Sequence, residues 1–199
     1  NSYLLYMKKI VLFFGTFNPI HLGHMKLAHY FVSHMEVEEV WLIVTPQNPF
    51  KTNEVLLDDF YRLEMVKRAC EPHAQLYSSD IEFDLPRPNY SIDTLRALNE
   101  KYTDLEFVLL IGEDNLASFH HWKGHESILK NFGLRVYPRQ HLGTIPERFI
   151  KHPNIRFVDA PKMNISATNI REQIKSGQDV SALLPIENGL YLQKNNFYR

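Results

Sequence analysis

The sequence predicts an α/β fold: a Rossmann-like, doubly wound parallel sheet with C-terminal helices packed on it. Apolar runs alternate with segments of helical periodicity, which is typical of a parallel sheet covered by helices. The runs at 8–14 and 105–111 are apolar almost throughout, as expected of strands that are buried on both faces. Polar loops follow the predicted strand ends, which is where ligands bind in such sheets.

The individual elements follow from local signals taken in chain order. A turn with Pro19 leads from the first strand into the first helix. Asp58 or Asp59 caps the second helix, because Asp accepts hydrogen bonds from the free N–H groups of a first turn. Ser91 opens the third helix after a proline-rich loop. The predicted strands are 8–14, 39–44, 75–79, 105–111, 134–137 and 155–158, and the predicted helices are 21–33, 58–70, 91–102, 122–132, 169–176 and 187–194.

Length and composition favour one domain spanning residues 1–199. Residues 1–6 are interpreted as a tag or upstream remnant, because Met7 could be the natural first residue. No apolar run approaches the roughly 20 residues that span a bilayer, so we expect no membrane partner. The single cysteine, Cys70, excludes an internal disulfide, suits a cytoplasmic location and is interpreted as a packing residue. The net charge of −1, without a basic block, argues against a nucleic-acid partner.

The segment Gly15–His24 joins the first strand to the first helix and indicates an anion site. Free N–H groups and a partial positive charge at a helix N-terminus attract phosphates. Gly15 permits close approach of the backbone, and His21 and His24 share one helix face. The alternatives are an inert histidine pair in the core or half of a metal site. Metal is disfavoured because no Cys or further His lies nearby at ligand spacing.

This segment resembles the GxFxPxHxGH signature of the nucleotidyltransferase superfamily, and every fixed position of the signature is present. The resemblance implies transfer of a nucleoside monophosphate from a triphosphate.

A second motif, ISATNIR, covers residues 165–171. Ser166 or Thr168 could act as a simple helix cap. Capping does not explain Arg171 near the positive end of a helix, where a cation is unfavourable unless an anion binds there. The motif therefore favours phosphate binding.

From about Met7 to Tyr191 the chain resembles the bacterial nicotinate-nucleotide adenylyltransferase family. ISATNIR is similar to the family's ISxTxIR, with Ala167 where Ser is frequent, and Phe50 stands where His often precedes Lys51. Further similar segments are RPNYSIDTL at 87–95, IGEDNL at 111–116 with Trp122 beyond, LLP at 183–185 and GLY at 189–191.

The resemblance implies a role for each matching residue. His24, His21 and Arg171 are the expected catalytic residues. The expected ATP-binding residues are Gly15, Phe17, His21, His24, Gly112, Asp114, Ser166, Thr168 and Arg171. The expected residues for the second substrate are Thr16, Lys51, Tyr90, Thr94, Asp114 and Trp122, with Thr94 near a nicotinate carboxylate and Trp122 stacked on the pyridine ring.

Several of these residues have a simpler interpretation as well. Trp122 alone would be a core or surface aromatic residue, Asp114 a cap, Thr94 a helix-surface residue and Lys51 a solvated lysine. Arg62 and Arg68 are interpreted as helix-surface charges, although Arg62 could point toward the site. The cluster His120, His121 and His125 is interpreted as exposed positions rather than a zinc site.

The reaction that the resemblance implies joins nicotinate mononucleotide to the AMP part of ATP and releases pyrophosphate. Mg²⁺ is expected on the ATP phosphates, without a protein ligand. Nicotinamide mononucleotide, alone or as a second acceptor, is the nearest alternative, followed by phosphopantetheine and polyol phosphates. A nucleotide-binding regulator without turnover and a metal-binding interaction protein are alternatives of other classes. Homo-oligomeric assembly is also left open.

Overall fold

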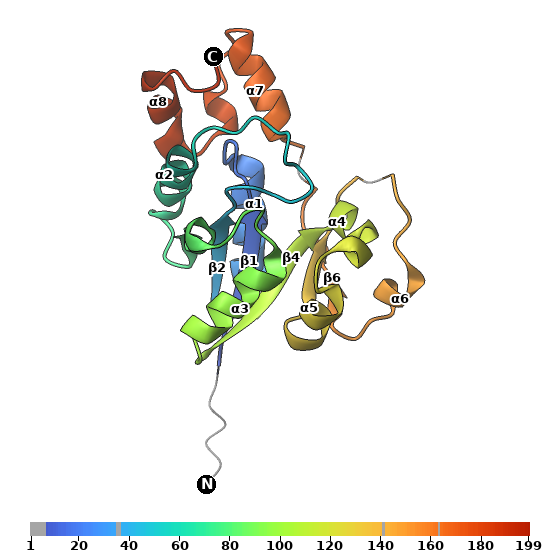
Figure 1. Cartoon of the computed structure of the whole chain (residues 1–199). Helices are drawn as coiled ribbons and strands as arrows, with labels where there is room; N and C mark the ends of the chain where they lie inside the picture. The colour runs from blue at the N-terminus through green and yellow to red at the C-terminus, as the bar shows by residue number, and fades with distance from the viewer. Residues whose placement is uncertain (1–6, 35–36, 141, 163) are drawn as a thin grey trace.

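The computed structural model describes residues 7–34, 37–140, 142–162 and 164–199. The interpretation of residues 1–6 lies outside this part of the chain. Within the described residues, six strands form one parallel sheet in the order β3-β2-β1-β4-β5-β6 (Figure 1). The order reverses between β1 and β4, which confirms the predicted doubly wound fold. The strands are β1 (Lys8–Gly15), β2 (Glu39–Val44), β3 (Leu76–Ser79), β4 (Leu105–Gly112), β5 (Leu134–Tyr137) and β6 (Ile155–Phe157).

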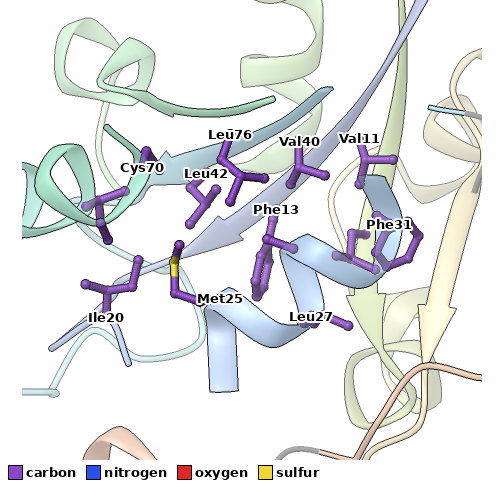
Figure 2. Packing of buried hydrophobic residues seen from close by; sticks show 14 of the residues in the cluster. Val11, Phe13, Ile20, Met25, Leu27, Phe31, Val40, Leu42, Cys70 and Leu76 are labelled. Atoms are coloured by element: carbon purple, nitrogen blue, oxygen red, sulfur yellow. The ribbon is translucent and has the colours of Figure 1, made fainter. Parts of the chain in front are cut away.

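The two faces of the sheet carry separate hydrophobic clusters, because successive side chains of a strand point to opposite faces. Val11 and Phe13 of β1 belong to the cluster under α1 (Leu22–His34) and α2 (Asp59–Cys70). Figure 2 shows Phe13 beside Met25 of α1 in this cluster. The opposite face packs against α3 (Ser91–Lys101), α4 (Glu113–Ala117) and α5 (His125–Asn131). Burial on both faces explains why the central strands read as continuous apolar runs.

The C-terminal helices α7 (Ala167–Lys175) and α8 (Ile186–Lys194) pack back on the domain, as predicted. They contribute to a third, smaller hydrophobic cluster, and α8 lies next to α2 (Figure 1). The fully buried Asn188 of α8 donates from Nδ2 to the Met65 carbonyl of α2 at 2.9 Å. The Arg68 guanidinium lies 4.3 Å from the centre of the Tyr191 ring. These contacts fix the position of the second motif relative to the sheet.

The predicted helix at 122–132 is wrong in its first part. A 3-10 turn, η2 (Phe119–His121), comes first, and α5 begins only at His125. Trp122 is extended, with ψ 136°, and Gly124 has φ 67°, a left-handed conformation that interrupts a helix. The sequence reasoning also missed η1 (Ile81–Asp84), α4, α6 (Glu147–Ile150) and η3 (Ser181–Leu183). Each of these is only a turn or so long, too short to show a periodic pattern.

Among the helices in the described part of the chain, none has the length and apolar character needed to cross a bilayer. Cys70 is buried at the end of α2, and burial raises the pKa of its thiol to about 12. Its predicted role as a packing residue is confirmed, because a buried thiol of this kind stays protonated and unreactive.

Candidate active site

Two adjoining pockets lie at the carboxyl edge of the sheet, where the strand order reverses between β1 and β4. Four loops that follow predicted strand ends contribute to them, at 15–24, 45–51, 112–122 and 161–171. Thr16, Asn48 and Ile111 line both pockets. The wider one, here called the outer cleft, is lined by Phe17, Asn18, His21, His24, Lys51, Glu54, Gly112, Asp114, Arg139, Ser166, Thr168 and Arg171, among others. The narrower one, the inner pocket, is lined by Gly15, Thr45, Phe50, Glu82, Asn89, Tyr90, Ser91, Trp122 and Lys123, among others.

The two histidines of the first motif stack on one another, with ring centres 3.6 Å apart. Nδ1 of His24 accepts a hydrogen bond from the His21 backbone N–H at 3.1 Å. Nδ1 of His21 accepts from the His24 backbone N–H at 3.4 Å. A neutral imidazole that accepts at Nδ1 carries its proton on Nε2. The local backbone thus leaves both Nε2–H groups free to donate into the outer cleft.

Both imidazoles are neutral in the free protein. Burial, together with the charge of Arg139, lowers the pKa of His21 to about 4. Burial, His21 and Arg139 lower the pKa of His24 well below its ordinary value. His24 lies against the edges of Phe13 and Phe17, which add to its desolvation. An anion in the cleft would raise these pKa values again, because it stabilises the charged form.

Gly15 is required by the packing of Phe17. A Cβ atom at Gly15 would lie 3.0 Å from the Phe17 ring. Phe17 is only 2% exposed and has φ 45°, a left-handed conformation that is unusual for a large residue. It forms an edge-to-face contact with Phe13 at 5.6 Å. Phe17 therefore acts as a wedge that shapes the turn, and it also lines the cleft.

The second motif closes the outer cleft from the C-terminal side. Ser166 caps α7 by accepting from the Asn169 backbone N–H at 3.1 Å, so the capping interpretation is confirmed. Arg171 is not explained by capping. Its guanidinium donates to the Asn18 carbonyl at 2.8 Å and to Thr168 Oγ1 at 3.3 Å, and it lies 3.6 Å from a Glu54 carboxyl oxygen. Arg171 thus links α7 to the turn of the first motif.

Asp114 and Arg139 form a charged pair that also lines the outer cleft. Arg139 Nε lies 3.5 Å from Asp114 Oδ2, while Asp114 Oδ1 is buried without a hydrogen bond among the described residues. A Cβ atom at Gly112 would lie 2.4 Å from Asp114 Oδ1 and 3.1 Å from Arg139 Cδ. A side chain at position 112 would therefore displace Asp114 and Arg139 from the positions that they take at the cleft. The unpaired Oδ1 can accept a hydrogen bond from a hydroxyl group of a ligand.

Sequence reasoning missed Arg139, although a signal was present. Arg139 comes two residues after the predicted strand 134–137, which ends at the same edge of the sheet as the other loops.

The inner pocket combines aromatic side chains with one lysine, Lys123, and one carboxyl group, that of Glu82. Trp122 packs against Phe119 at 5.3 Å and faces Phe50 at 6.4 Å. Lys123 lies over the Tyr90 ring, with Nζ 4.7 Å from its centre, and pairs with Asp93 at 2.7 Å. A flat ring with an anionic substituent fits these surroundings, because aromatic faces stack and a cation balances the charge.

Thr94 is the predicted site residue that lies outside both pockets. It is fully buried, so the alternative of a helix-surface residue is wrong. Its hydroxyl donates to Glu82 Oε1 at 2.7 Å and lies 3.4 Å from the Tyr90 carbonyl. Thr94 therefore stands behind the wall of the inner pocket and supports Glu82. The other predicted site residues line one pocket or the other, with Lys51 exposed at the cleft rim.

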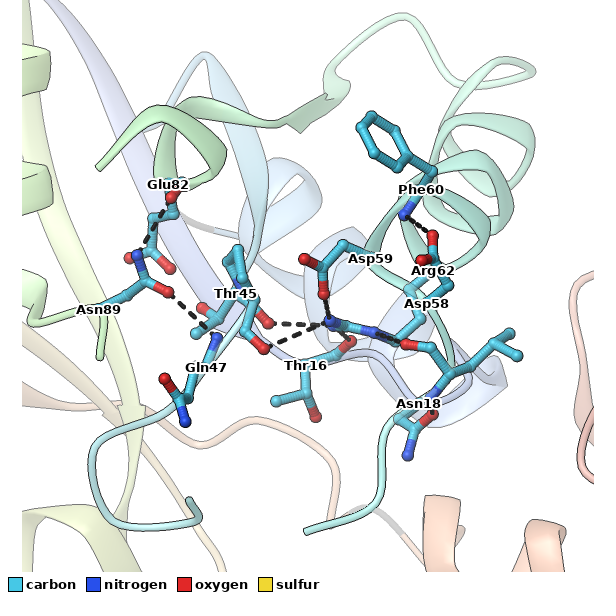
Figure 3. A network of polar contacts seen from close by, with 12 residues as sticks. Thr16, Asn18, Thr45, Gln47, Asp58, Asp59, Phe60, Arg62, Glu82 and Asn89 are labelled. Carbon is cyan, nitrogen blue, oxygen red and sulfur yellow. Dashed lines mark hydrogen bonds and ion pairs between the residues drawn. The ribbon is translucent and has the colours of Figure 1, made fainter. Parts of the chain in front are cut away.

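Arg62 is not a helix-surface charge, because its side chain is fully buried. Figure 3 shows it surrounded by carbonyl groups of the loops after β1 and β2. Its guanidinium donates to the carbonyls of Leu57 at 2.8 Å and Thr45 at 3.0 Å, to that of Thr16, and to Asp59. Arg62 thereby sets the spacing of the loops without lining a pocket.

Arg68 and the cluster of His120, His121 and His125 lie away from both pockets. Arg68 is 40% exposed and pairs with Glu64 on the same helix. Among the described residues, no group of three or more His, Cys, Asp and Glu side chains could hold a metal ion.

The sequence profile of the Cytidylyltransferase-like family matches residues 12–173. A Flavobacterium psychrophilum protein named probable nicotinate-nucleotide adenylyltransferase is 47% identical over 191 residues, which cover 96% of this chain and 99% of that protein. A Christiangramia forsetii protein of the same name is also 47% identical, over 192 residues, with 96% and 99% coverage.

Solved structures agree on the fold. The Plasmodium falciparum nicotinic acid mononucleotide adenylyltransferase complexed with NaAD superposes with a TM-score of 0.79 and 19% identity, and covers 96% of this chain and 97% of that one. At this identity the structural likeness shows the fold alone, whereas the sequence relatives show the family. The chain belongs to the nicotinate-nucleotide adenylyltransferases, within the Cytidylyltransferase-like family.

Proposed function

We propose that this chain transfers AMP from ATP to nicotinate mononucleotide, which gives nicotinate adenine dinucleotide and pyrophosphate in NAD biosynthesis. The observation that carries the proposal is the convergence of two sites at one sheet edge. A cleft with His21, His24 and Arg171 suits a polyphosphate, and an adjoining pocket with Trp122 and Lys123 suits a pyridine carboxylate. The names of the 47% identical relatives support the same substrates.

The reaction needs positioning more than proton transfer. A phosphate oxygen of nicotinate mononucleotide attacks the α-phosphorus of ATP and forms the new P–O bond. The bond between the α-phosphorus and the bridging oxygen breaks, and pyrophosphate leaves with that oxygen and its electron pair. The attacking phosphate is already anionic near pH 7, so no side chain has to remove a proton. Catalysis then depends on bringing two polyanions together and stabilising the leaving charge.

The residues of the outer cleft supply that stabilisation. In this proposal Nε2–H of His24 donates to the α-phosphate, and His21 adds a second donor from the same turn, since the Nδ1 atom of each ring already accepts from the backbone. Arg171 is the candidate for the β- and γ-phosphates, with Ser166 and Thr168 beside it. Arg139 adds positive charge to the same cleft, and Asp114 offers Oδ1 to a ribose hydroxyl. Mg²⁺ carried on the ATP phosphate oxygens would supply further charge neutralisation.

The acceptor occupies the inner pocket in this proposal. Its pyridine ring stacks on Trp122, and Tyr90 and Lys123 close the opposite side. Thr16 lines both pockets, so the acceptor phosphate next to it would reach the α-phosphorus. Lys51 at the cleft rim would face the same phosphate groups. The cytoplasmic location, homo-oligomeric assembly and lack of a nucleic-acid partner stay predictions from the sequence.

Product analysis tests the proposal. Purified protein is incubated with ATP, Mg²⁺ and nicotinate mononucleotide, and the products are identified by mass spectrometry. We expect the dinucleotide and pyrophosphate in equal amounts. Consumption of ATP with the mononucleotide left intact would show simple hydrolysis and contradict the proposal. Parallel reactions with phosphopantetheine and a polyol phosphate should give no adenylated product.

A further inference from the structure

The inner pocket contains a carboxyl group that the transfer reaction itself does not use. Glu82 lies on η1 and is only 1% exposed, yet it lines the inner pocket together with Trp122 and Tyr90. Its Oε1 accepts a hydrogen bond from Thr94 Oγ1 at 2.7 Å. Its Oε2 is buried and has no hydrogen bond of good geometry within the described residues. The Thr45 hydroxyl also acts on this carboxyl group. A buried carboxyl oxygen that lacks a well-aligned hydrogen bond beside a ligand pocket indicates an interaction that a ligand can complete.

Glu82 is held firmly in this place. Its backbone carbonyl accepts from Asn89 Nδ2 at 3.1 Å, as Figure 3 shows. The same Asn89 side chain accepts from the Gln47 backbone N–H at 3.1 Å, and the Asn89 backbone N–H donates to the Gln47 carbonyl at 2.8 Å. The loop after β2 and the loop before α3 are thus joined through Asn89. Because η1 is tied to both loops, these bonds hold the Glu82 backbone beside the pocket, and the Thr94 bond holds the carboxyl group itself.

The charge of Glu82 is not set by an ion pair. Burial is the largest effect and raises the pKa of Glu82 to about 7, against the opposing effect of the Thr94 and Thr45 hydroxyls. The charged groups on the surrounding elements are paired with one another, Lys123 with Asp93 and Arg87 with Asp59. Asp84, on η1 itself, is exposed. The pKa of Glu82 therefore lies in the pH range where the enzyme would work, so that both forms of the carboxyl group bear on ligand binding.

The two forms of this carboxyl group favour different pyridine substituents. A protonated carboxyl can donate a hydrogen bond to a carboxylate, as in nicotinate. An ionised carboxyl repels a carboxylate and instead accepts from the N–H of a carboxamide. The ring that stacks on Trp122 brings its substituent into the pocket that Glu82 lines.

We propose that Glu82 is a specificity-determining residue that selects a pyridine carboxylate over a pyridine carboxamide while it is protonated, and loses this selectivity when it is ionised. The inference rests on the proposed function and deepens it, because it assigns the choice between the two acceptors to one side chain.

The test is the ratio of kcat/KM for nicotinate mononucleotide to kcat/KM for nicotinamide mononucleotide, measured across pH. The ratio cancels every titration that the two acceptors share, including that of their phosphate groups. For the unaltered protein we expect it to fall about tenfold from about pH 6 to about pH 8, because the protonated fraction of a group with a pKa of about 7 falls by that factor. A ratio that is constant over this range would overturn the proposal.

The variant Glu82→Gln carries an amide that donates a hydrogen bond at every pH. We expect its ratio to change less than about twofold over the same range, since the titrating proton is gone. Asp84→Asn is the matched control, since it removes an exposed carboxyl from the same helical turn, and it should keep the pH dependence of the unaltered protein. If the kcat/KM ratio of Glu82→Gln changes with pH as much as that of the unaltered protein, the assignment of selectivity to Glu82 is wrong.

Proton uptake gives a second readout that needs neither turnover nor a variant. Calorimetric titrations at about pH 8, in buffers of different ionisation enthalpy and with an unreactive ATP analogue present, count the protons taken up on binding. Nicotinate mononucleotide should take up close to one proton more than nicotinamide mononucleotide, because its carboxylate raises the pKa of Glu82. Equal uptake would contradict the proposal even if Glu82→Gln failed to fold.

The outcomes separate this inference from the proposed function. Lack of dinucleotide formation with either acceptor at about pH 6 refutes the proposed function, and the inference with it. If nicotinate mononucleotide is turned over but the kcat/KM ratio of the two acceptors does not change with pH, the inference about Glu82 is refuted and the proposed function stands.

Discussion

His21 and His24 are arranged as a pair of neutral donors, not as a cationic site. Each Nδ1 is occupied by the backbone N–H of the other histidine, so each Nε2–H remains for a ligand. Burial keeps both rings uncharged until an anion arrives. This arrangement needs histidines three residues apart in this turn, and it explains the spacing in the first motif.

Replacing His24 by Ala should lower kcat at least about 10²-fold, by analogy with the loss of a single oxyanion-hole donor. Steady-state pyrophosphate release measures the effect. The matched control is His34→Ala, at the exposed end of the same helix, which should retain its activity. A folded His24→Ala protein with normal kcat would refute the role of this residue.

The depressed pKa of His21 predicts a specific loss of stability in acid. An unfolded histidine has a pKa of about 6.5, whereas that of the folded residue is about 4. Between these values the unfolded chain binds more protons, so stability falls as the pH drops from about 6.5 to about 4. Over this pH range, the free energy of unfolding of His21→Asn should therefore fall by about 3 kcal/mol less than that of the unaltered protein.

Urea denaturation at several pH values measures this difference. His34→Asn serves as the control for removal of an imidazole from the same helix. If the His21→Asn protein and the unaltered protein show parallel losses, His21 is not the group that couples stability to pH.

Trp122 should contribute to acceptor binding more than to ATP binding. Trp122→Ala removes the ring surface of the inner pocket, so KM for nicotinate mononucleotide should rise about tenfold while KM for ATP changes little. Initial rates with each substrate varied in turn measure both constants. An equal rise in the two constants would place Trp122 in the general packing of the fold.

At the scale of elements, α2 sets the distance between two loops of the site. Arg62 reaches from α2 to the carbonyls that follow β1 and β2, and Asp59 pairs with both Arg62 and Arg87. Desolvation by burial lowers the pKa of Arg62, and the charge of Asp59 opposes this effect. The guanidinium keeps hydrogen-bond acceptors, namely backbone carbonyls and Asp59. The network is more than a surface salt bridge, because the guanidinium has no contact with solvent.

Arg62→Ala should reduce the free energy of unfolding by about 3 kcal/mol or more, because several buried carbonyls lose their donor. Urea denaturation followed by circular dichroism measures it. Lys67→Ala, an exposed change on the same helix, should cost less than about 0.5 kcal/mol. A similar small cost for Arg62→Ala would contradict the positioning role.

The strands and both motifs were predictable because their signals are local. The apolar run at 105–111 and the turn Gly15–His24 can each be recognised from a few consecutive residues. Arg62 was not predictable, because its partners follow two different strands and become neighbours only in the folded sheet. Glu82 escaped notice for the same reason, since η1 is a single turn that packs against β2 and α3.

In the whole molecule, the fold brings two motifs that lie far apart in the sequence to one edge of the sheet. The first motif follows β1, and the second motif arrives on α7 after β6. Docking of α8 on α2 and the Arg171 bond to the Asn18 carbonyl hold them together. Phosphate binding therefore depends on the complete fold, and the inner pocket opens from the same edge.

In the proposed reaction, this edge of the sheet joins a pyridine mononucleotide to AMP. The decisive measurement is pyrophosphate release from ATP and Mg²⁺ with and without nicotinate mononucleotide, with Arg171→Ala measured alongside the unaltered protein. We expect release that requires the mononucleotide and falls at least about 10²-fold in Arg171→Ala. Absence of release from folded protein that binds ATP, or release that does not depend on the mononucleotide, would contradict it.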